Sequence, residues 1–445
     1  MSVIKEGTLK YQDDVWKEVS AQIEGNELII KKKDKVITKI DLSEAASAEM
    51  DGESAKPNAF VIEGKDKNYN FICKDKDELD KWVHSLQKVI NADSCMVNTK
   101  DCEKLNEQKN SKEKLLTIDD IEIIKVIGRG HFGKVQLVRN KKDGQIYAMK
   151  SMSKQSIQSD NLVSRVLEER DLLMSLDHPF IVSAKYALQT PTKVLILTDF
   201  IPGGELTKRI QEDIHFSIER IRLYGAMLVS AIGYLHQNQI IHRDIKPDNI
   251  LIDKDGYLML ADFGLVKTGV MSSTCTGTFC GTPEYIAPEI ILNESYTKSV
   301  DWWSLGIILY QMFYGIPPFM NANTDQLYQS ILNDQVEFPE TMDIDPDLKD
   351  LIEKLLEKFS DQRIGKGFQD SGELEEHPFF DSIDFDKLYN KGYEMEWKPE
   401  IKDPLDISHF DEKYTNLDIG LTPETGTITR SLQDMFAHFT YNNNK

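Results

Sequence analysis

His242-Arg243-Asp244-Ile245-Lys246-Pro247-Asp248-Asn249 is the most informative stretch of this chain, and Asp262-Phe263-Gly264 follows it closely. Between them lie two short apolar runs, 250–252 and 258–260, on either side of the turn residues 253–256. This pattern predicts a β-hairpin that presents both segments at one cleft. Together the segments supply two aspartates, a lysine and an asparagine, which is the set that phosphoryl transfer from ATP requires.

Each of these side chains has a task in that chemistry. Asp244 would receive the proton of the acceptor hydroxyl, and Lys246 would offset charge on the transferred phosphoryl group. Asn249 and Asp262 would hold Mg²⁺ against the phosphates. The sequence therefore predicts an ATP- and Mg²⁺-dependent phosphotransferase.

Composition narrows the class of protein. The chain has 445 residues, 40% of them hydrophobic, which is enough for two or three domains. Its formal net charge of −21 disfavours nucleic acid as a partner and suits cationic partners such as basic peptides. Five cysteines without paired metal-ligand spacing indicate reduced thiols. Without a signal-like or membrane-spanning run, we expect a cytoplasmic monomer that reaches a membrane only peripherally.

A glycine-rich stretch predicts the nucleotide site. Residues 127–135 form a G-x-G-x-F-G-x-V run between two β-type segments, and its expected nucleotide contacts are Ile127, Gly128, Gly130, Phe132, Gly133 and Val135. A dinucleotide-binding turn would lead into a helix, whereas residues 135–138 continue as a strand. The pattern favours a flap over ATP phosphates.

Over about 260 residues, 121–380, the chain resembles the eukaryotic protein kinases, which implies a bilobal α+β fold. The resemblance places Lys150, after Ala148 on the next strand, against the α- and β-phosphates. Glu168 and Glu169 both qualify as its partner on the following helix, and the usual separation in the family (169 − 150 = 19) favours Glu169. The remaining expected contacts lie around the adenine and ribose: Thr198, Asp199, Ile201 and Glu205.

The activation segment is similar to that of the AGC group of serine/threonine kinases. Thr278, in Thr278-Phe279-Cys280-Gly281-Thr282-Pro283-Glu284-Tyr285, is the expected activating phosphosite. A phosphate there would be attracted to Arg243 and would order the loop. Ala287-Pro288-Glu289 would close the segment with Arg363 as the buried partner of Glu289, and residues 301–306 would brace the catalytic loop.

The tail, residues 381–445, agrees with this grouping. Ser408–Thr415 resembles the AGC segment that crosses the nucleotide cleft, and Thr422 stands in a turn-motif phosphosite. Residues 436–441 form an F-x-x-F-T-Y motif, with Thr440 as a phosphosite. Phe436 and Phe439 would be buried in a groove of the small lobe, and an upstream phosphoinositide-dependent kinase would dock through them.

Residues 1–92 read as several short strands followed by an amphipathic helix, 76–90, around Trp82. They resemble a pleckstrin-homology (PH) domain, an all-β barrel with a C-terminal helix, and residues 93–118 read as a polar linker. The whole multidomain chain then resembles the protein kinase B (Akt) family. That resemblance implies autoinhibition by the PH domain and membrane recruitment through 3-phosphoinositides.

The PH-like region departs from the lipid-binding pattern. The first arginine of the chain is Arg129. Val19 stands where a lipid-binding PH domain usually has an arginine, which binds a phosphate through two hydrogen bonds. Lys10 and Lys17 remain as candidate lipid contacts, beside the basic run Lys31-Lys32-Lys33. Specific 3-phosphoinositide binding, weak binding to anionic lipid and a protein-interaction role all stay open.

Four acidic side chains are the expected contacts of a basic substrate: Glu205, Asp248, Glu284 and Asp325. They predict an R-x-R-x-x-S/T-like preference. Gln311, where a glutamate is expected, predicts weaker selection for an arginine nearer the acceptor. A pseudokinase scaffold is the remaining alternative, and the complete catalytic set argues against it.

Overall fold

The structure is a computed structural model of the full chain, which separates into two compact units, residues 1–114 and 115–445. Each unit is described by itself. The residues that the structure describes are 3–12, 16–24, 27–32, 35–42, 45–50, 59–64, 68–74, 78, 79, 82, 86, 116–130, 133–157, 159–213, 215–268, 281–340, 342–367, 369–420, 428–437 and 439–442.

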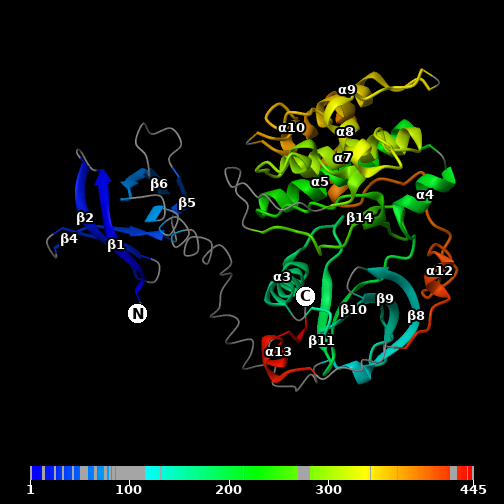
Figure 1. The fold of residues 1–445 in the computed structure, drawn as a ribbon, viewed down its shortest axis with the longest axis horizontal. Coiled ribbons are helices and arrows are strands. Elements are labelled where there is room, and N and C mark those ends of the chain that lie inside the picture. Colours follow the sequence, from blue (N-terminus) through cyan, green and yellow to red (C-terminus); the bar gives the residue numbers. More distant parts are fainter. Residues whose placement is uncertain are drawn as a thin grey trace. The chain divides into compact units, whose positions relative to one another are not determined.

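The first unit is an antiparallel sheet of seven strands in the order β4-β3-β2-β1-β7-β6-β5 (Figure 1). The strands are β1 (Val3–Gln12), β2 (Trp16–Glu24), β3 (Glu27–Lys32), β4 (Lys35–Asp41), β5 (Ala45–Met50), β6 (Ala59–Gly64) and β7 (Asn68–Ile72). Alternate side chains face an apolar core that includes Leu9, Ile30, Phe60 and Phe71. Trp82 lies in a helical segment and is fully buried in that core. The all-β N-terminal domain with a C-terminal helix is therefore confirmed.

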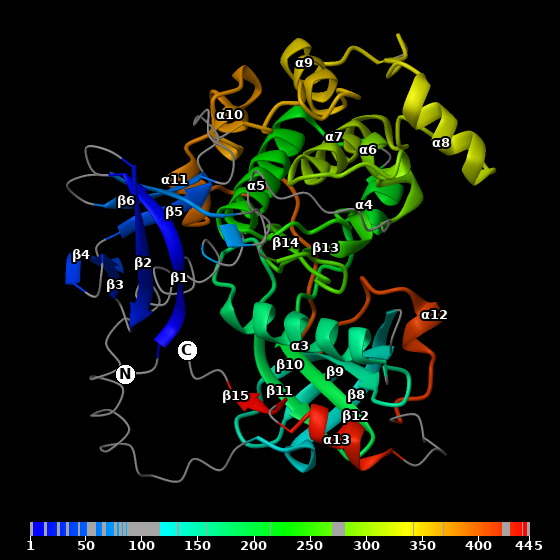
Figure 2. The same ribbon diagram turned by 60° about the vertical axis from the view of Figure 1, so that its left-hand side comes forward.

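The second unit is bilobal. Its small lobe is a six-stranded sheet in the order β15-β11-β12-β10-β9-β8, beside which α3 lies (Figure 2). The elements are β8 (Ile121–Gly130), β9 (Gly133–Asn140), β10 (Ile146–Ser153), α3 (Asp160–Ser175), β11 (Ala184–Gln189), β12 (Lys193–Asp199) and β15 (Tyr441–Asn442). The strand β12 is buried on both faces, with Leu195 and Leu197 in one apolar core and Val194 and Ile196 in another.

The large lobe is mostly helical. Its elements are α4 (Leu206–Asp213), α5 (Ile218–Gln237), β13 (Ile250–Ile252), β14 (Leu258–Leu260), α6 (Pro288–Ile291), α7 (Ser299–Tyr314), α8 (Thr324–Asn333), α9 (Pro346–Leu355), α10 (Ser371–Glu375) and α11 (Phe385–Tyr389). The helix α7 is buried along almost its whole length, including Trp302 and Trp303. The predicted hairpin is present as β13 paired with β14.

The tail returns to the small lobe, with α12 (Glu412–Thr415) beside β8 and α13 (Arg430–Met435) before β15 (Figure 2). Its last strand pairs with β11, so that Tyr441 lies opposite Ala187. None of the described helices is both long enough and apolar enough to span a bilayer.

Candidate active site

The glycine-rich run forms the turn of the β8–β9 hairpin. Gly128 pairs with Val135, and Gly130 pairs with Gly133. A Cβ atom on Gly133 would lie 1.6 Å from the carbonyl oxygen of Ser151, so only glycine fits against β10 here. Phe132 lies outside the described residues.

Lys150 lies between a carboxylate of the small lobe and a carboxylate of the large lobe. Its Nζ donates to Glu169 Oε1 on α3 at 2.7 Å and to Asp262 Oδ1 at 2.9 Å. The expected partner Glu169 is thus present. Burial alone would lower the pKa of Lys150, but the two carboxylates outweigh it and raise that pKa above its usual value. Conversely, Lys150 lowers the pKa of Asp262, which keeps this carboxylate ionised for a cation.

The backbone is strained at two residues of the site, one before and one after the β13–β14 hairpin. Arg243 has φ of 67° and Asp262 has φ of 56°, in the left-handed region that residues with a side chain seldom adopt. Each such conformation costs about 1–3 kcal/mol and persists only where surrounding contacts impose it. At Arg243 those contacts are hydrogen bonds to Asp301, described below.

In the catalytic loop, residues 242–249, the carboxylate of Asp244 accepts several hydrogen bonds. Asp244 Oδ2 accepts from Lys246 Nζ at 3.0 Å and from Asn249 Nδ2 at 2.9 Å. Thr282 donates to Asp244 Oδ1 at 2.9 Å and accepts from Lys246 at 2.6 Å. Thr282 belongs to the activation-segment motif, residues 278–285, but the sequence predicted no role for it. Its hydroxyl fixes the orientation of the expected base and links the loop to the activation segment.

Asn249 and Asp262 have the chemistry that a Mg²⁺ site requires. Because the Asn249 amide nitrogen donates to Asp244, its amide oxygen is the atom left to meet a cation. Asp262 presents an ionised carboxylate nearby. Within the described residues, no group of three or more acidic, histidine or cysteine side chains is arranged to hold a metal ion by itself. That agrees with Mg²⁺, which is usually held by one or two carboxylates together with substrate phosphates.

The adenine side of the cleft is the end of β12 and the chain that follows it. Ala148 lies opposite Thr198 in the sheet, and the Thr198 hydroxyl donates to the Ala148 carbonyl at 3.4 Å. Asp199 is exposed and Ile201 is buried at the start of the large lobe. These positions agree with the expected nucleotide contacts, whose roles stay predictions.

The tail crosses this edge as expected. The ring of Phe410 stacks on Phe200 with 5.6 Å between centroids, and Lys208 donates to the carbonyl of Ser408 at 3.1 Å. Gly204, at φ of 75°, lies so close to the His409 carbonyl that a Cβ atom there would be 2.5 Å from it. The tail segment around His409 and Phe410 therefore packs on residues 200–204, the chain that follows β12. Thr422 lies outside the described residues.

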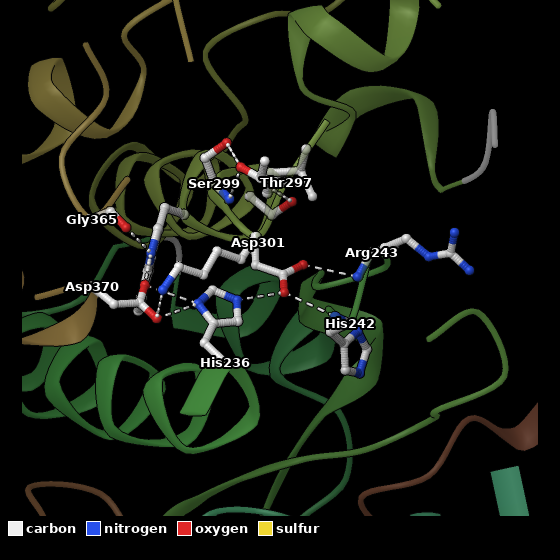
Figure 3. A network of polar contacts seen from close by, with 12 residues as sticks. His236, His242, Arg243, Thr297, Ser299, Asp301, Gly365 and Asp370 are labelled. Atoms are coloured by element: carbon white, nitrogen blue, oxygen red, sulfur yellow. Dashed lines mark hydrogen bonds and ion pairs between the residues drawn. The ribbon is translucent and has the colours of Figure 1, made fainter. Parts of the chain in front are cut away.

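A network of buried polar side chains contacts the catalytic loop at His242 and Arg243 (Figure 3). Asp301, fully buried on α7, accepts from the backbone amides of His242 and Arg243, each at 2.9 Å. Its Oδ2 also meets His236 Nε2 at 2.9 Å, and His236 Nδ1 meets Asp370 at 3.1 Å. The sequence indicated that residues 301–306 brace the loop. It did not indicate His236 or Asp370, which lie far apart in the chain.

His236 should make stability pH-dependent. Burial lowers its pKa, but the hydrogen bonds to Asp301 and Asp370 outweigh burial and raise the pKa above 6.5. A raised pKa in the folded state stabilises the fold below about pH 6.5, and this contribution disappears as pH rises through the folded-state pKa. In urea unfolding across that range, we expect wild type to lose more stability than His236→Gln. Parallel stability curves for the two proteins would contradict this reading.

The activation segment ends at a buried ion pair. Arg363 donates to both oxygens of Glu289, at 2.7 and 3.0 Å, and both side chains are buried. The expected pairing is present. Arg363 also donates to the Ser299 and Glu357 carbonyls, so most of its guanidinium N–H groups have a hydrogen-bond acceptor.

The guanidinium of Arg243 contacts neutral groups. Its guanidinium donates to the carbonyls of Leu265 and Val266 and to the Tyr296 hydroxyl, all neutral acceptors. A pocket lined by Arg243, Asp244, Thr282 and Tyr285 adjoins it. The expected phosphosite Thr278 lies outside the described residues.

The hydrophobic motif lies in the small lobe. Phe436 and Phe439 are fully buried, and Arg170 on α3 lies 5.3 Å from the Phe439 ring centroid. Gln189 donates to the Phe436 carbonyl at 2.8 Å. Lys154, also fully buried, donates to Gln433 of α13 at 2.8 Å. Lys154 and Gln189 carried no sequence signal, since they become neighbours only when the tail folds back.

Phe439→Ala should loosen the tail. Burying such a ring stabilises the docked tail by about 2 kcal/mol, so we expect faster amide hydrogen exchange in α13 and β15 and a lower midpoint of small-lobe unfolding. Met435→Ala, at a position 38% exposed, is the matched control and should change neither quantity. Unchanged exchange in Phe439→Ala would show that this ring does not hold the tail.

Residues 121–380 match the protein kinase domain, and residues 401–441 match the protein kinase C terminal domain. A "RAC family serine/threonine-protein kinase homolog" of Dictyostelium discoideum is 38% identical over 387 residues, which cover 86% of this chain and 83% of that protein. The chain belongs to the AGC group of serine/threonine protein kinases. Its nucleotide substrate is therefore ATP, its cofactor Mg²⁺, and its phosphate acceptors are proteins.

Other relatives match a shorter share of this kinase. "Serine/threonine-protein kinase Sgk2" of Homo sapiens is 41% identical over 327 residues, 72% of this chain and 88% of that protein. "Serine/threonine-protein kinase YPK2/YKR2" of Saccharomyces cerevisiae is 43% identical over 333 residues, 75% of this kinase but only 49% of the yeast protein. The kinase thus spans about half the length of that relative.

Proposed function

We propose that this kinase phosphorylates serine and threonine in R-x-R-x-x-S/T-like sites within a phosphoinositide, growth-type signalling pathway. The observation that carries the substrate preference is a row of carboxylates beside Asp244. Asp248 adds to burial in raising the pKa of Glu205, and Asp248 and Glu284 both raise the pKa of Tyr285. Such effects require Asp248 to lie near Glu205, and Asp248 and Glu284 each to lie near Tyr285.

The row extends onto α8, since Glu284 and Asp325 both raise the pKa of Tyr328. Glu205 and Asp248 would pair with an arginine three residues before the acceptor, and Asp325 with one five residues before it. Gln311 contributes no charge, because its side chain is a neutral amide, and its Oε1 accepts from the Tyr285 hydroxyl at 2.7 Å. An arginine nearer the acceptor would therefore be selected weakly.

Peptide kinetics test this preference. Asp248→Asn and Glu205→Gln should raise KM about ten-fold or more for a peptide with arginine at −3, because each removes a charge-assisted hydrogen bond. A peptide with alanine at −3 should respond to neither change. Asp255→Asn, an exposed aspartate in the β13–β14 turn, is the matched control. Equal effects on both peptides would refute the assignment.

Activation would proceed by phosphorylation of Thr278 and Thr440. Phosphate on Thr278 would supply the charge that the neutral acceptors around Arg243 lack. Thr440 is exposed next to the buried Phe439, whose ring lies 5.3 Å from the guanidinium of Arg170. An upstream phosphoinositide-dependent kinase would dock through Phe436 and Phe439. Because both rings are buried here, the tail would first have to leave its groove.

The N-terminal unit would direct a cytoplasmic kinase to anionic, phosphoinositide-bearing membranes. Lys10 is exposed on β1, and Lys17 lies in β2 with its side chain outside the described residues. One observation favours the alternative, a unit that binds a protein partner. Val19, where an arginine was expected, is buried in the apolar core beside Leu9. Binding to vesicles with and without 3-phosphoinositides separates the two functions.

A further inference from the structure

The β3–β4 hairpin ends in an exposed apolar pair. Val36 and Ile37 are each 43% exposed, and they are the two large apolar side chains so exposed among the described residues of the N-terminal unit. Further along the same hairpin, Leu28 pairs with Ile40 in the core. The tip therefore departs from the pattern that buries the apolar residues of this sheet.

A bulge explains why both side chains are exposed. The register shifts between Ile30, opposite Thr38, and Lys31, opposite Val36, which leaves Ile37 as the extra residue. A bulge turns the strand and releases one residue from the alternation of faces. Sheet geometry thus presents two adjacent apolar residues at one end of the unit.

Lysines surround the pair. Residues 31–39 contain five lysines and one aspartate, a local charge of +4 in a chain of −21. Lys32 and Lys35 are exposed and directly opposite each other in the ladder. Neither has an ion pair among the described residues, whereas Lys39 is paired with Glu27 at 2.7 Å. Opposed like charges destabilise a hairpin, so nothing within the described unit explains this pair.

We propose that the tip of the β3–β4 hairpin is a membrane-contact surface, which inserts Val36 and Ile37 into an anionic bilayer while Lys32 and Lys35 meet its headgroups. A bilayer places negative charge directly above hydrocarbon, which matches lysines around an apolar tip. The proposal rests on the membrane recruitment given above and deepens it. Because residues 1–128 contain no arginine, the lysines act as point charges, and affinity follows surface charge rather than the phosphate pattern of one headgroup.

Vesicle co-sedimentation of the full chain tests this surface. The vesicles are phosphatidylcholine alone, phosphatidylcholine with phosphatidylserine, and phosphatidylcholine with a 3-phosphoinositide at matched surface charge. We expect no binding to the first and similar binding to the other two. Lys32→Glu/Lys35→Glu should weaken binding more than about 20-fold, since each lysine contributes about five-fold. Val36→Ser/Ile37→Ser should weaken it about ten-fold or more.

Two controls keep the test decisive. Lys32→Glu and Lys74→Glu form a matched pair of single charge reversals on exposed lysines, and only the first should weaken binding, by about five-fold or more. Far-ultraviolet circular dichroism of each variant verifies that it is folded. Binding only to 3-phosphoinositide vesicles, equal loss in Lys74→Glu and Lys32→Glu, or unchanged binding in the hairpin variants would overturn the proposal. Phosphorylation of a soluble peptide without vesicles should be equal in all variants, so failure of the kinase assignment is seen separately.

Discussion

Asp262→Ala should reduce kcat for peptide phosphorylation by about 10³-fold or more while the protein stays folded. The change removes the carboxylate expected to hold Mg²⁺, and removing one preorganised charge from such a site costs about 10²- to 10³-fold even without a metal. The pair between Lys150 and Glu169 lies within the small lobe and does not depend on Asp262, so the small lobe keeps this contact. Steady-state kinetics with saturating ATP measure the effect.

Asp255→Ala is the control for that prediction. This aspartate lies in the β13–β14 turn between the two catalytic segments, is exposed, and has no expected role in catalysis. Its kcat should stay within about two-fold of wild type, because exposed surface substitutions rarely matter. A wild-type rate in Asp262→Ala would remove this residue from the chemistry.

Arg363→Ala should destabilise the large lobe by about 3–5 kcal/mol, the largest effect on stability that we expect. It leaves Glu289 as a buried charge without its partner, and the desolvation of that charge is then no longer compensated. Thermal unfolding followed by circular dichroism measures the loss.

The double change Glu289→Met/Arg363→Leu separates charge from packing. Replacing both members of a buried pair by apolar residues is often neutral, so the double variant should recover most of the stability that the single variant loses. If Arg363→Ala unfolds at the wild-type temperature, the pair has no structural role. If the double variant is as unstable as the single one, lost packing and not the stranded charge is the cause.

Sequence reasoning reached the catalytic centre because its residues lie in contiguous runs. Asp244, Lys246 and Asn249 fall within one loop, so one motif identified them, and the resemblance to the protein kinases selected Glu169 by its usual separation from Lys150. The pair of Arg363 with Glu289 and the burial of Phe436 were also expected, from the resemblance to the AGC kinases.

Side chains outside such runs were missed for a physical reason. His236 reaches Asp370 across 134 residues, and Lys154 reaches Gln433 across 279, so only tertiary packing makes them neighbours. The β3–β4 bulge was missed as well, because one extra residue in a strand leaves no pattern that differs from ordinary alternation over so short a run.

The central claim is that this chain is an active serine/threonine kinase selective for basic sites. The most direct test is transfer of phosphate from ATP with Mg²⁺ to an R-x-R-x-x-S peptide, using protein first phosphorylated on Thr278. Turnover on the order of 1–100 s⁻¹, with much slower turnover of a peptide in which both arginines are alanine, is the predicted result. No turnover above that of Asp262→Ala would contradict the account.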